Sequence, residues 1–218
     1  MAEPSSLREL RTKELTTLKG RVARRIKIKP STKRVRRIAG IDIMLTPQAS
    51  KVHICACLVS FPKLEVLEEA IATDELDMLL YRNLGPLVFV PLVLSVLKML
   101  KRKVDVIAVR EPALGEEIPL ASYVGVISGR PSFGVSERVG GLRKIAKWEG
   151  TRRAGLLKLR KSKAGVSVVA GHLLSLRDAM SLARASAKET RLPEPIRNAG
   201  VRVRAWEREW RRVNLERR

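Results

Sequence analysis

Short apolar runs of strand length recur along this chain, and segments of helical length separate the later ones. The run over 104–109 is almost continuously apolar, which is typical of a strand buried on both faces of a parallel sheet. The expected strands are 37–44, 52–61, 64–71, 104–109, 132–135 and 166–169, of which 64–71 could also be helical. A meander followed by alternating helices and strands predicts an α/β fold with a mixed sheet.

Sequence patterns typical of helices occur before and between the expected strands. Ser6 and Glu9 form a capping-box pattern ahead of leucines at helical spacing, which predicts a first helix over about 7–22. Asp74 and Glu75 resemble the acidic first turn of a helix over 73–80. Further helices are expected over 89–100, 120–127 and 175–187. No internal repeat or domain boundary is evident, so residues 1–218 are expected to form a single domain.

Positive charge dominates the composition. The chain has 44 Lys and Arg against 22 Asp and Glu, a formal net charge of +22. Solubility needs a net charge of only about 2–8 in a small domain, whereas a field of this size concentrates polyanions and favours phosphate contacts. Nucleic acid is therefore the expected partner. A membrane surface ranks below it, because no segment pairs a long apolar face with a basic one.

Hydropathy is that of a folded chain rather than a disordered one. Hydrophobic residues make up 45% of the sequence and gather in runs. The longest apolar stretch, 84–97, is interrupted by Gly85, Pro86 and Pro91, so we expect no membrane span. No signal-peptide pattern is visible, which makes a cytoplasmic location the default expectation. Gln and Asn are scarce, as in hyperthermophilic proteins or in products of a G+C-rich genome.

Basic residues cluster in segments 19–37, 143–163 and 202–218. Such segments are typical of proteins that neutralise crowded phosphates without reading sequence. Trp148 lies in the second segment, where base stacking and packing are equally good interpretations. Trp206 and Trp210, one helical turn apart, are expected to pack on the core. The candidate nucleic-acid contacts are Arg24, Arg25, Lys27, Lys33, Arg34, Arg36, Arg37, Arg143, Lys144, Lys147, Trp148, Arg152, Arg153, Lys158, Arg160 and Lys161.

The two cysteines, Cys55 and Cys57, alternate along one expected strand with His53, so the three side chains share a face. A His-Cys-Cys metal site is one interpretation. Closed metal sites prefer Cys-x-x-Cys spacing and four ligands, however, and the chain has no second pair. We therefore expect two buried or half-buried thiols and no metal.

Six segments occur in a characteristic order: 38–42 (IAGID), 85–89 (GPLVF), 120–126 (LASYVGV), 134–135 (GV), 170–176 (AGH followed by SL) and 191–197 (RLPEPIR). In this order, over nearly the full length, they resemble the endonuclease V family. The resemblance implies a ribonuclease H-like mixed sheet flanked by helices. It also implies a metal-dependent nuclease that recognises deaminated adenine and holds a divalent ion with several carboxylates.

The carboxylates that the resemblance implies are mostly missing. Asp42 matches the first of them. Pro91 stands where a glutamate is expected after Phe89, and Arg110 where an aspartate is expected. Arg110 would place a fixed positive charge where the cation should lie, so we expect it to pair with Asp42, retained as a structural acceptor. A one-residue shift that brings Glu111 into the site is the alternative.

Other family positions differ as well. The expected histidine falls near Gly200, and Arg138 could partly replace an expected lysine. The family wedge Tyr-x-Pro-Gly becomes a stretch from Tyr81 to Gly85 with an extra residue and no proline. A base-flipping pocket for hypoxanthine is therefore not expected.

These departures predict a catalytically inactive endonuclease V scaffold without a cofactor. We expect it to bind structured RNA in preference to DNA, as a component of or factor for a ribonucleoprotein such as the ribosome of a thermophilic archaeon. One alternative is an active metal-dependent nuclease with a rebuilt site that acts on inosine-containing DNA or RNA. The other is a protein-interaction adaptor with a basic surface.

Overall fold

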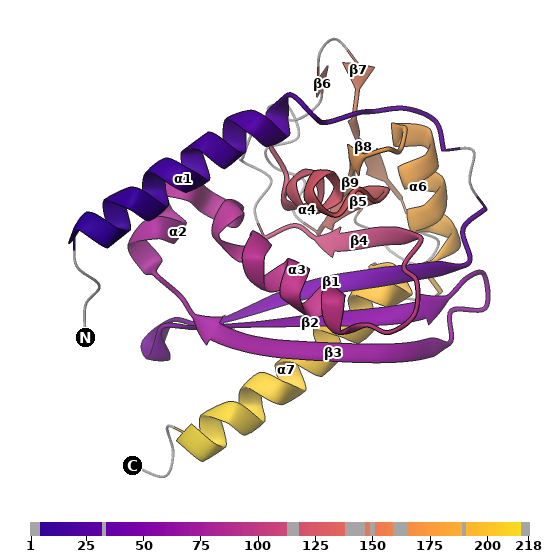
Figure 1. Ribbon diagram of the computed structural model, residues 1–218. Helices are drawn as coiled ribbons and strands as arrows, with labels where there is room; N and C mark the ends of the chain where they lie inside the picture. The colour runs from indigo at the N-terminus through magenta and orange to yellow at the C-terminus, as the bar shows by residue number, and fades with distance from the viewer. Residues whose placement is uncertain are drawn as a thin grey trace.

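The computed structural model describes residues 5–31, 34–112, 118–137, 147–148, 151–158, 165–188 and 191–214. Its centre is a seven-stranded sheet with the strand order β3-β2-β1-β4-β5-β9-β8 (Figure 1). The strands are β1 (Arg37–Thr46), β2 (Lys51–Ser60), β3 (Val66–Glu75), β4 (Val106–Arg110), β5 (Ser132–Ser136), β8 (Ala154–Leu157) and β9 (Val166–His172). A small second sheet pairs β6 (Lys147–Trp148) with β7 (Thr151–Arg152).

Strand direction is mixed. β1, β4 and β5 run parallel to one another, and the other neighbours in the large sheet are antiparallel. Helices cover both faces of the parallel part, which explains why β4 is apolar over nearly its whole length. This mixed sheet flanked by helices confirms the predicted fold class.

The helices are α1 (Ser5–Ala23), α2 (Met78–Leu84), α3 (Val90–Met99), α4 (Leu120–Ser128), α6 (Leu176–Ala185) and α7 (Glu194–Asn214), with short 3-10 turns η1 (Pro47–Ala49) and η2 (Gly85–Phe89). Helices α3 and α4 pack on one face of the sheet and are covered by α1, and α6 and α7 pack on the other face (Figure 1). Alternate residues of β2 serve the two cores: Ile54 faces the first, and Cys55 the second.

The predicted helix over 73–80 is wrong in its first half. β3 continues to Glu75, because residues 66 and 68–75 pair with β2, up to Glu75 opposite Lys51. The helix begins only at Met78, where the Asp77 carboxylate accepts hydrogen bonds from the backbone N–H groups of Leu79 and Leu80. The ambiguous run 64–71 is largely strand. Pairing with β2 outweighed the local helix-start signal of Asp74 and Glu75.

The cysteines are buried in the core beneath α7. Burial raises the pKa of both thiols to about 12, so both stay protonated and bind metals poorly. His53 is also buried and hydrogen-bonds the hydroxyls of Thr46 and Thr73. No group of three or more His, Cys, Asp or Glu in the described part of the chain is placed to hold a metal ion.

The two tryptophans of helix α7 contact residues of the sheet. The Trp206 indole donates a 3.0 Å hydrogen bond to Thr73 Oγ1. The Trp210 ring lies 5.4 Å from the His53 ring, centroid to centroid. Both side chains are half-buried, as expected for packing on the core.

The segment Met78–Met99 is long and apolar enough to meet the criterion for a membrane-spanning helix. Core helices meet the same criterion. Here the segment is divided into α2, η2 and α3, and Val90, Val93 and Val96 of α3 are buried in the core with β2. Packing on the sheet accounts for its composition.

Candidate functional site

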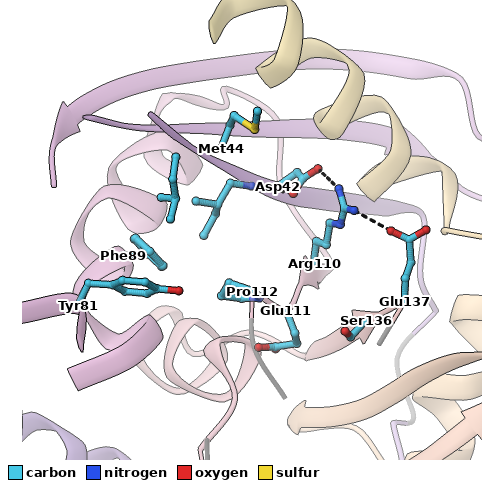
Figure 2. Close-up of a pocket in the computed structure, with 11 residues that line it drawn as sticks. Asp42, Met44, Tyr81, Phe89, Arg110, Glu111, Pro112, Ser136 and Glu137 are labelled. Atoms are coloured by element: carbon cyan, nitrogen blue, oxygen red, sulfur yellow. Dashed lines mark hydrogen bonds and ion pairs between the residues drawn. The ribbon is translucent and has the colours of Figure 1, made fainter. Parts of the chain in front are cut away.

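The parallel strands β1, β4 and β5 bring three charged side chains together. Ile41 pairs with Val109, so the next residues along, Asp42 and Arg110, are neighbours on adjacent strands. Glu137 directly follows β5 on the other side of β4. A cavity of about 360 Å³ opens here, lined by Asp42, Ile43, Met44, Leu45, Tyr81, Phe89, Arg110, Glu111, Pro112, Ser136 and Glu137 (Figure 2).

Arg110 bridges the two carboxylates. Its Nη1 lies 3.0 Å from Asp42 Oδ2, and its Nη2 lies 2.6 Å from Glu137 Oε2 (Figure 2). Only 4% of the Asp42 side chain is exposed, against 32% for Arg110. The other oxygen of Asp42, Oδ1, accepts a 2.8 Å hydrogen bond from the backbone N–H of Ile43. Both oxygens of the buried carboxylate therefore have donors.

Helix α7 supplies a second guanidinium. Arg204 Nη1 lies 3.7 Å from Asp42 Oδ2. The helix comes this close because two glycines lack side chains: a Cβ at Gly40 would overlap the backbone of Pro195, and one at Gly200 would overlap the Asp42 carboxylate. Two arginines and two carboxylates thus share the site, with formal charges that sum to zero.

Burial and charge act in opposite directions on this pair. Burial raises the pKa of Asp42 above its usual range, although the guanidinium of Arg110 and the Ile43 hydrogen bond act to lower it. Burial alone would lower the pKa of Arg110, but the charges of Asp42 and Glu137 outweigh it and raise the pKa. Arg110 is therefore a permanent cation at this position.

Glu111 lines the cavity but is bound to another element. Its carboxylate oxygens accept hydrogen bonds of 3.0 and 2.9 Å from the backbone N–H groups of Leu120 and Ala121, in the first turn of α4. Complete burial raises its pKa to about 7, despite these hydrogen bonds and the nearby charge of Arg153. A Cβ at Gly134 would overlap this side chain. Glu111 acts as a cap for α4, and it does not replace the expected carboxylate beside Asp42.

Comparison with known proteins identifies the scaffold. The family model of endonuclease V matches residues 20–201. The chain belongs to the endonuclease V family. The endonuclease V of Gloeobacter violaceus is 26% identical over 182 residues, covering 76% of this chain and 74% of the relative. That of Trichormus variabilis is 24% identical over 181 residues, covering 77% and 82%.

Solved endonuclease V structures share the fold. The Streptomyces avermitilis protein superposes with a TM-score of 0.75 at 21% identity, covering 90% of this chain and 93% of that one. The Ciona intestinalis protein, solved in complex with a 24mer DNA containing an inosine followed by a ribo-adenosine, gives 0.77 at 18% identity, covering 92% and 99%. Identities this low establish the fold alone.

The residues at the cavity do not fit the divalent ion that the family resemblance implies. Among the described residues, the buried carboxylate of Asp42 has a guanidinium at its Oδ2, and the other buried carboxylate of this cavity, Glu111, is hydrogen-bonded to α4. Pro91 lies exposed in the first turn of α3 and lines a different cavity. Hard divalent cations require several oxygen ligands, which this arrangement does not provide.

The wedge position also differs from the family pattern. Tyr81 belongs to α2, which continues to Leu84 before Gly85 ends it. The Tyr81 ring packs on Phe89 with its centroid 5.1 Å away and borders the cavity (Figure 2). Tyr81 is thus held in a helix rather than in a short turn.

The predicted nucleic-acid contacts fall into three groups. Arg24, Arg25, Lys27, Arg34, Arg36, Arg152 and Lys158 are exposed, and Arg37 is half-buried. Lys33, Arg143, Lys144, Arg160 and Lys161, together with Arg138, lie outside the described residues, and for Lys147 and Trp148 only the strand β6 is described.

Arg153 departs from the expectation. Its side chain has no exposed surface, and its charge acts on Glu111 in the interior. It therefore cannot contact a partner on the surface in this conformation. The preceding residue, Arg152, is exposed, and sequence clustering alone could not separate the two.

Sequence reasoning missed Arg204. Its signal was the helical spacing of four residues from Gly200, where the family histidine was expected. Glu137 was visible only as part of a divergent stretch after β5, and its pairing with Arg110 depends on the order of β4 and β5.

Proposed function

We propose that this protein is a nuclease-inactive member of the endonuclease V family that binds structured RNA. The observation that carries the proposal is the Arg110 guanidinium, which lies 3.0 Å from Asp42 where the family resemblance expects the third metal carboxylate. We further propose that the protein works in the cytoplasm as a component of or factor for a ribonucleoprotein such as the ribosome, in a thermophilic archaeon.

Electrostatics argues against metal-dependent chemistry at Asp42. A divalent ion about 4 Å from the Arg110 charge would be repelled by roughly 8 kcal/mol at an effective dielectric constant of about 20. The charges of Asp42, Glu137, Arg110 and Arg204 already cancel, so little net attraction remains for a cation. Without an ion, neither a metal-bound nucleophile nor charge stabilisation at a scissile phosphate is available.

The charge of the whole chain supports a polyanionic partner. A net charge of +22 exceeds what solubility requires, and the exposed arginines and lysines that precede β1 can neutralise backbone phosphates. RNA is favoured over DNA because clustered basic segments suit crowded RNA phosphates. The proposal implies binding that depends steeply on salt and weakly on sequence.

A cleavage assay tests the loss of chemistry. Inosine-containing RNA and DNA are incubated with magnesium or manganese, with wild-type protein and with Asp42→Ala. We expect no turnover with either protein. An active endonuclease V is the second candidate, favoured by the relatives that carry that name. Metal-dependent cleavage by wild type that disappears in Asp42→Ala would establish it and overturn the proposal.

A binding assay tests the partner. Contact with about 6–10 phosphates implies a slope of log affinity against log salt of about −4 to −9, using 0.7–0.9 per phosphate. A slope near zero would exclude the electrostatic account. Native purification with and without nuclease treatment, followed by mass spectrometry, identifies the assembly. Protein partners that survive nuclease treatment would favour an adaptor role instead.

A further inference from the structure

A second concave surface lies at the far edge of the sheet from β3, where α6 packs beside the edge strand β8 (Figure 1). This groove, here called the α6–β8 groove, has a volume of about 750 Å³ and is open to solvent. None of its residues lines the cavity beside Asp42. It is bordered by Arg152, Gly155, Leu156, Ser175, Leu176, Arg177, Met180, Ser181 and Arg184.

Three arginines surround the groove. Arg177 and Arg184 are two turns apart on α6, and Arg152 stands at the end of β7, just before β8. All three are exposed, and none forms an ion pair with another described residue. No carboxylate is among the described residues that line the groove.

The nearby carboxylate of Asp178 is already used. Its Oδ2 accepts a 2.7 Å hydrogen bond from the Ser175 hydroxyl and a 2.9 Å hydrogen bond from the backbone N–H of Ser31. Asp178 and Ser175 form the capping box of α6. The carboxylate therefore stabilises the helix start and the chain that crosses it; Arg177 lowers the pKa of Asp178 but forms no ion pair with it, and Arg152 and Arg184 are not among the residues that act on it.

Between the arginines the groove is apolar. Leu156 leaves 45% of its surface exposed, which is unusual for a leucine in a sheet. Leu176 and Met180 of α6 face Gly155 of β8: a Cβ at Gly155 would lie 3.5 Å from each side chain. Because Gly155 has no side chain, the space between strand and helix stays open. The groove thus combines an apolar floor with a basic rim.

We propose that the α6–β8 groove binds an unpaired segment of RNA, with its phosphates on the arginines and its bases or riboses on Leu156 and Met180. This inference rests on the proposed RNA-binding function and assigns it a specific surface. Arginine presents a planar fork of donors that matches phosphate oxygens. An apolar floor contributes only when bases are unstacked and accessible, which favours an unpaired strand over a duplex.

Position in the fold favours RNA over an acidic peptide. The groove begins where the hairpin of β6 and β7, within the predicted basic segment 143–163, continues into β8. A polyanion lying in the groove would therefore also contact the exposed Arg152 at the end of this hairpin, whereas a short acidic peptide would need only the arginines of α6. The peptide is the outcome that the experiment must exclude.

The test compares two variants that each lose two positive charges. The groove variant is Arg177→Gln with Arg184→Gln. The matched control is Lys63→Gln with Lys98→Gln, two exposed residues that lie outside the three basic segments. Affinity for a short unpaired RNA is measured by fluorescence anisotropy across a salt series. We expect the groove variant to bind about tenfold to thirtyfold more weakly near 0.1 M salt, with a slope smaller in magnitude by about 1.4, as two lost phosphate contacts require.

A third variant separates the floor from the rim. Leu156→Gln keeps the charge and should weaken binding of the unpaired RNA without changing the salt slope. Binding of a duplex should be unaffected. Ultraviolet cross-linking of 4-thiouridine RNA to the unmodified protein gives a readout that needs no variant, and we expect cross-linked peptides from 152–156 and 176–184.

Each outcome decides a different question. Wild-type protein that binds no RNA would overturn the proposed function. Wild-type binding with a groove variant equal to the control, and with cross-links elsewhere, would overturn this inference and leave the proposed function intact. The last comparison is a competition between an acidic peptide of equal charge and unlabelled RNA. If the peptide displaces the bound RNA at the same concentration as unlabelled RNA does, the groove binds a protein partner.

Discussion

Asp42 and Arg110 lie on adjacent parallel strands and are joined by a 3.0 Å contact between Oδ2 and Nη1. The Asp42 carboxylate is buried, with only 4% of its side-chain surface exposed. At a position that the family resemblance assigns to metal chemistry, the structure thus has an ion pair whose partners stabilise each other in the folded state.

Breaking this ion pair should reveal its strength. Arg110→Ala leaves Asp42 buried with only the more distant Arg204, so we expect a loss of about 1–3 kcal/mol in unfolding free energy. A double-mutant cycle with Asp42→Ala, followed by chemical denaturation, isolates the coupling. The exposed pair Lys51–Glu75 is the control, and its coupling should stay below about 1 kcal/mol. Equal couplings for the two pairs would contradict a structural role for Arg110.

Two helix glycines should respond to alanine in opposite ways. Gly200→Ala places a methyl group on the Asp42 carboxylate and beside Arg204, so we expect a destabilisation of about 1–3 kcal/mol. Gly20→Ala in α1 meets no atom within 4 Å and should stabilise the protein by about 0.5–1 kcal/mol. Thermal unfolding of both variants measures the difference. Similar melting temperatures would mean that α7 does not approach Asp42 this closely.

Glu111 should make stability depend on pH. Burial raises its pKa from 4.5 to about 7, so between these values the folded state keeps a proton that the unfolded state has lost. Its contribution to stability is complete below about pH 4.5 and falls as pH rises towards 7, by up to roughly 3 kcal/mol. Glu111→Gln retains an oxygen for the α4 backbone but cannot titrate.

Unfolding free energies of wild type and Glu111→Gln, measured from pH 4.5 to 7.5, check this contribution. The difference between the two proteins should change steadily in favour of the variant as pH increases. Parallel pH profiles would show that Glu111 is ionised throughout the range.

Exposed basic residues, not the cavity beside Asp42, should carry the RNA affinity. Replacing Arg24, Arg25 and Lys27 with Gln should weaken binding similarly for different RNA sequences and reduce the salt slope by about one per lost phosphate contact. Asp42→Asn should leave affinity unchanged or slightly higher, because it removes a negative charge. Loss of RNA binding in a folded Asp42→Asn variant, with no effect of the three basic changes, would place the function back at the cavity.

Much of the fold could be read from local patterns. The apolar runs located β1, β2, β4 and β5 to within two residues, because burial on one or both faces leaves a direct mark on hydropathy, whereas the short edge strand β8 was not predicted. The helix expected over 73–80 failed at its start, because the acidic residues of 73–75 belong to a strand that pairs with β2. Local capping chemistry cannot report a pairing partner some 20 residues away.

At the site, the sequence supplied the chemistry but not its partners. It indicated that Arg110 replaces a carboxylate, that Pro91 provides none and that Asp42 remains. The sequence could not show that Glu111 turns to cap α4, that Arg204 reaches Asp42 across Gly200, or that Arg153 is buried while Arg152 is exposed. These facts depend on contacts between elements far apart in the chain.

The sequence by itself determined the order of most strands and helices, the family resemblance and the excess of positive charge, because hydropathy, motif order and charge are properties of consecutive residues. Only the tertiary structure decided which charges face each other. The register of β1 against β4 sets Arg110 on Asp42, and the packing of α6 beside β8 leaves Arg177 and Arg184 around an apolar groove. Charge pairing depends on distance in space, and folding alone sets that distance.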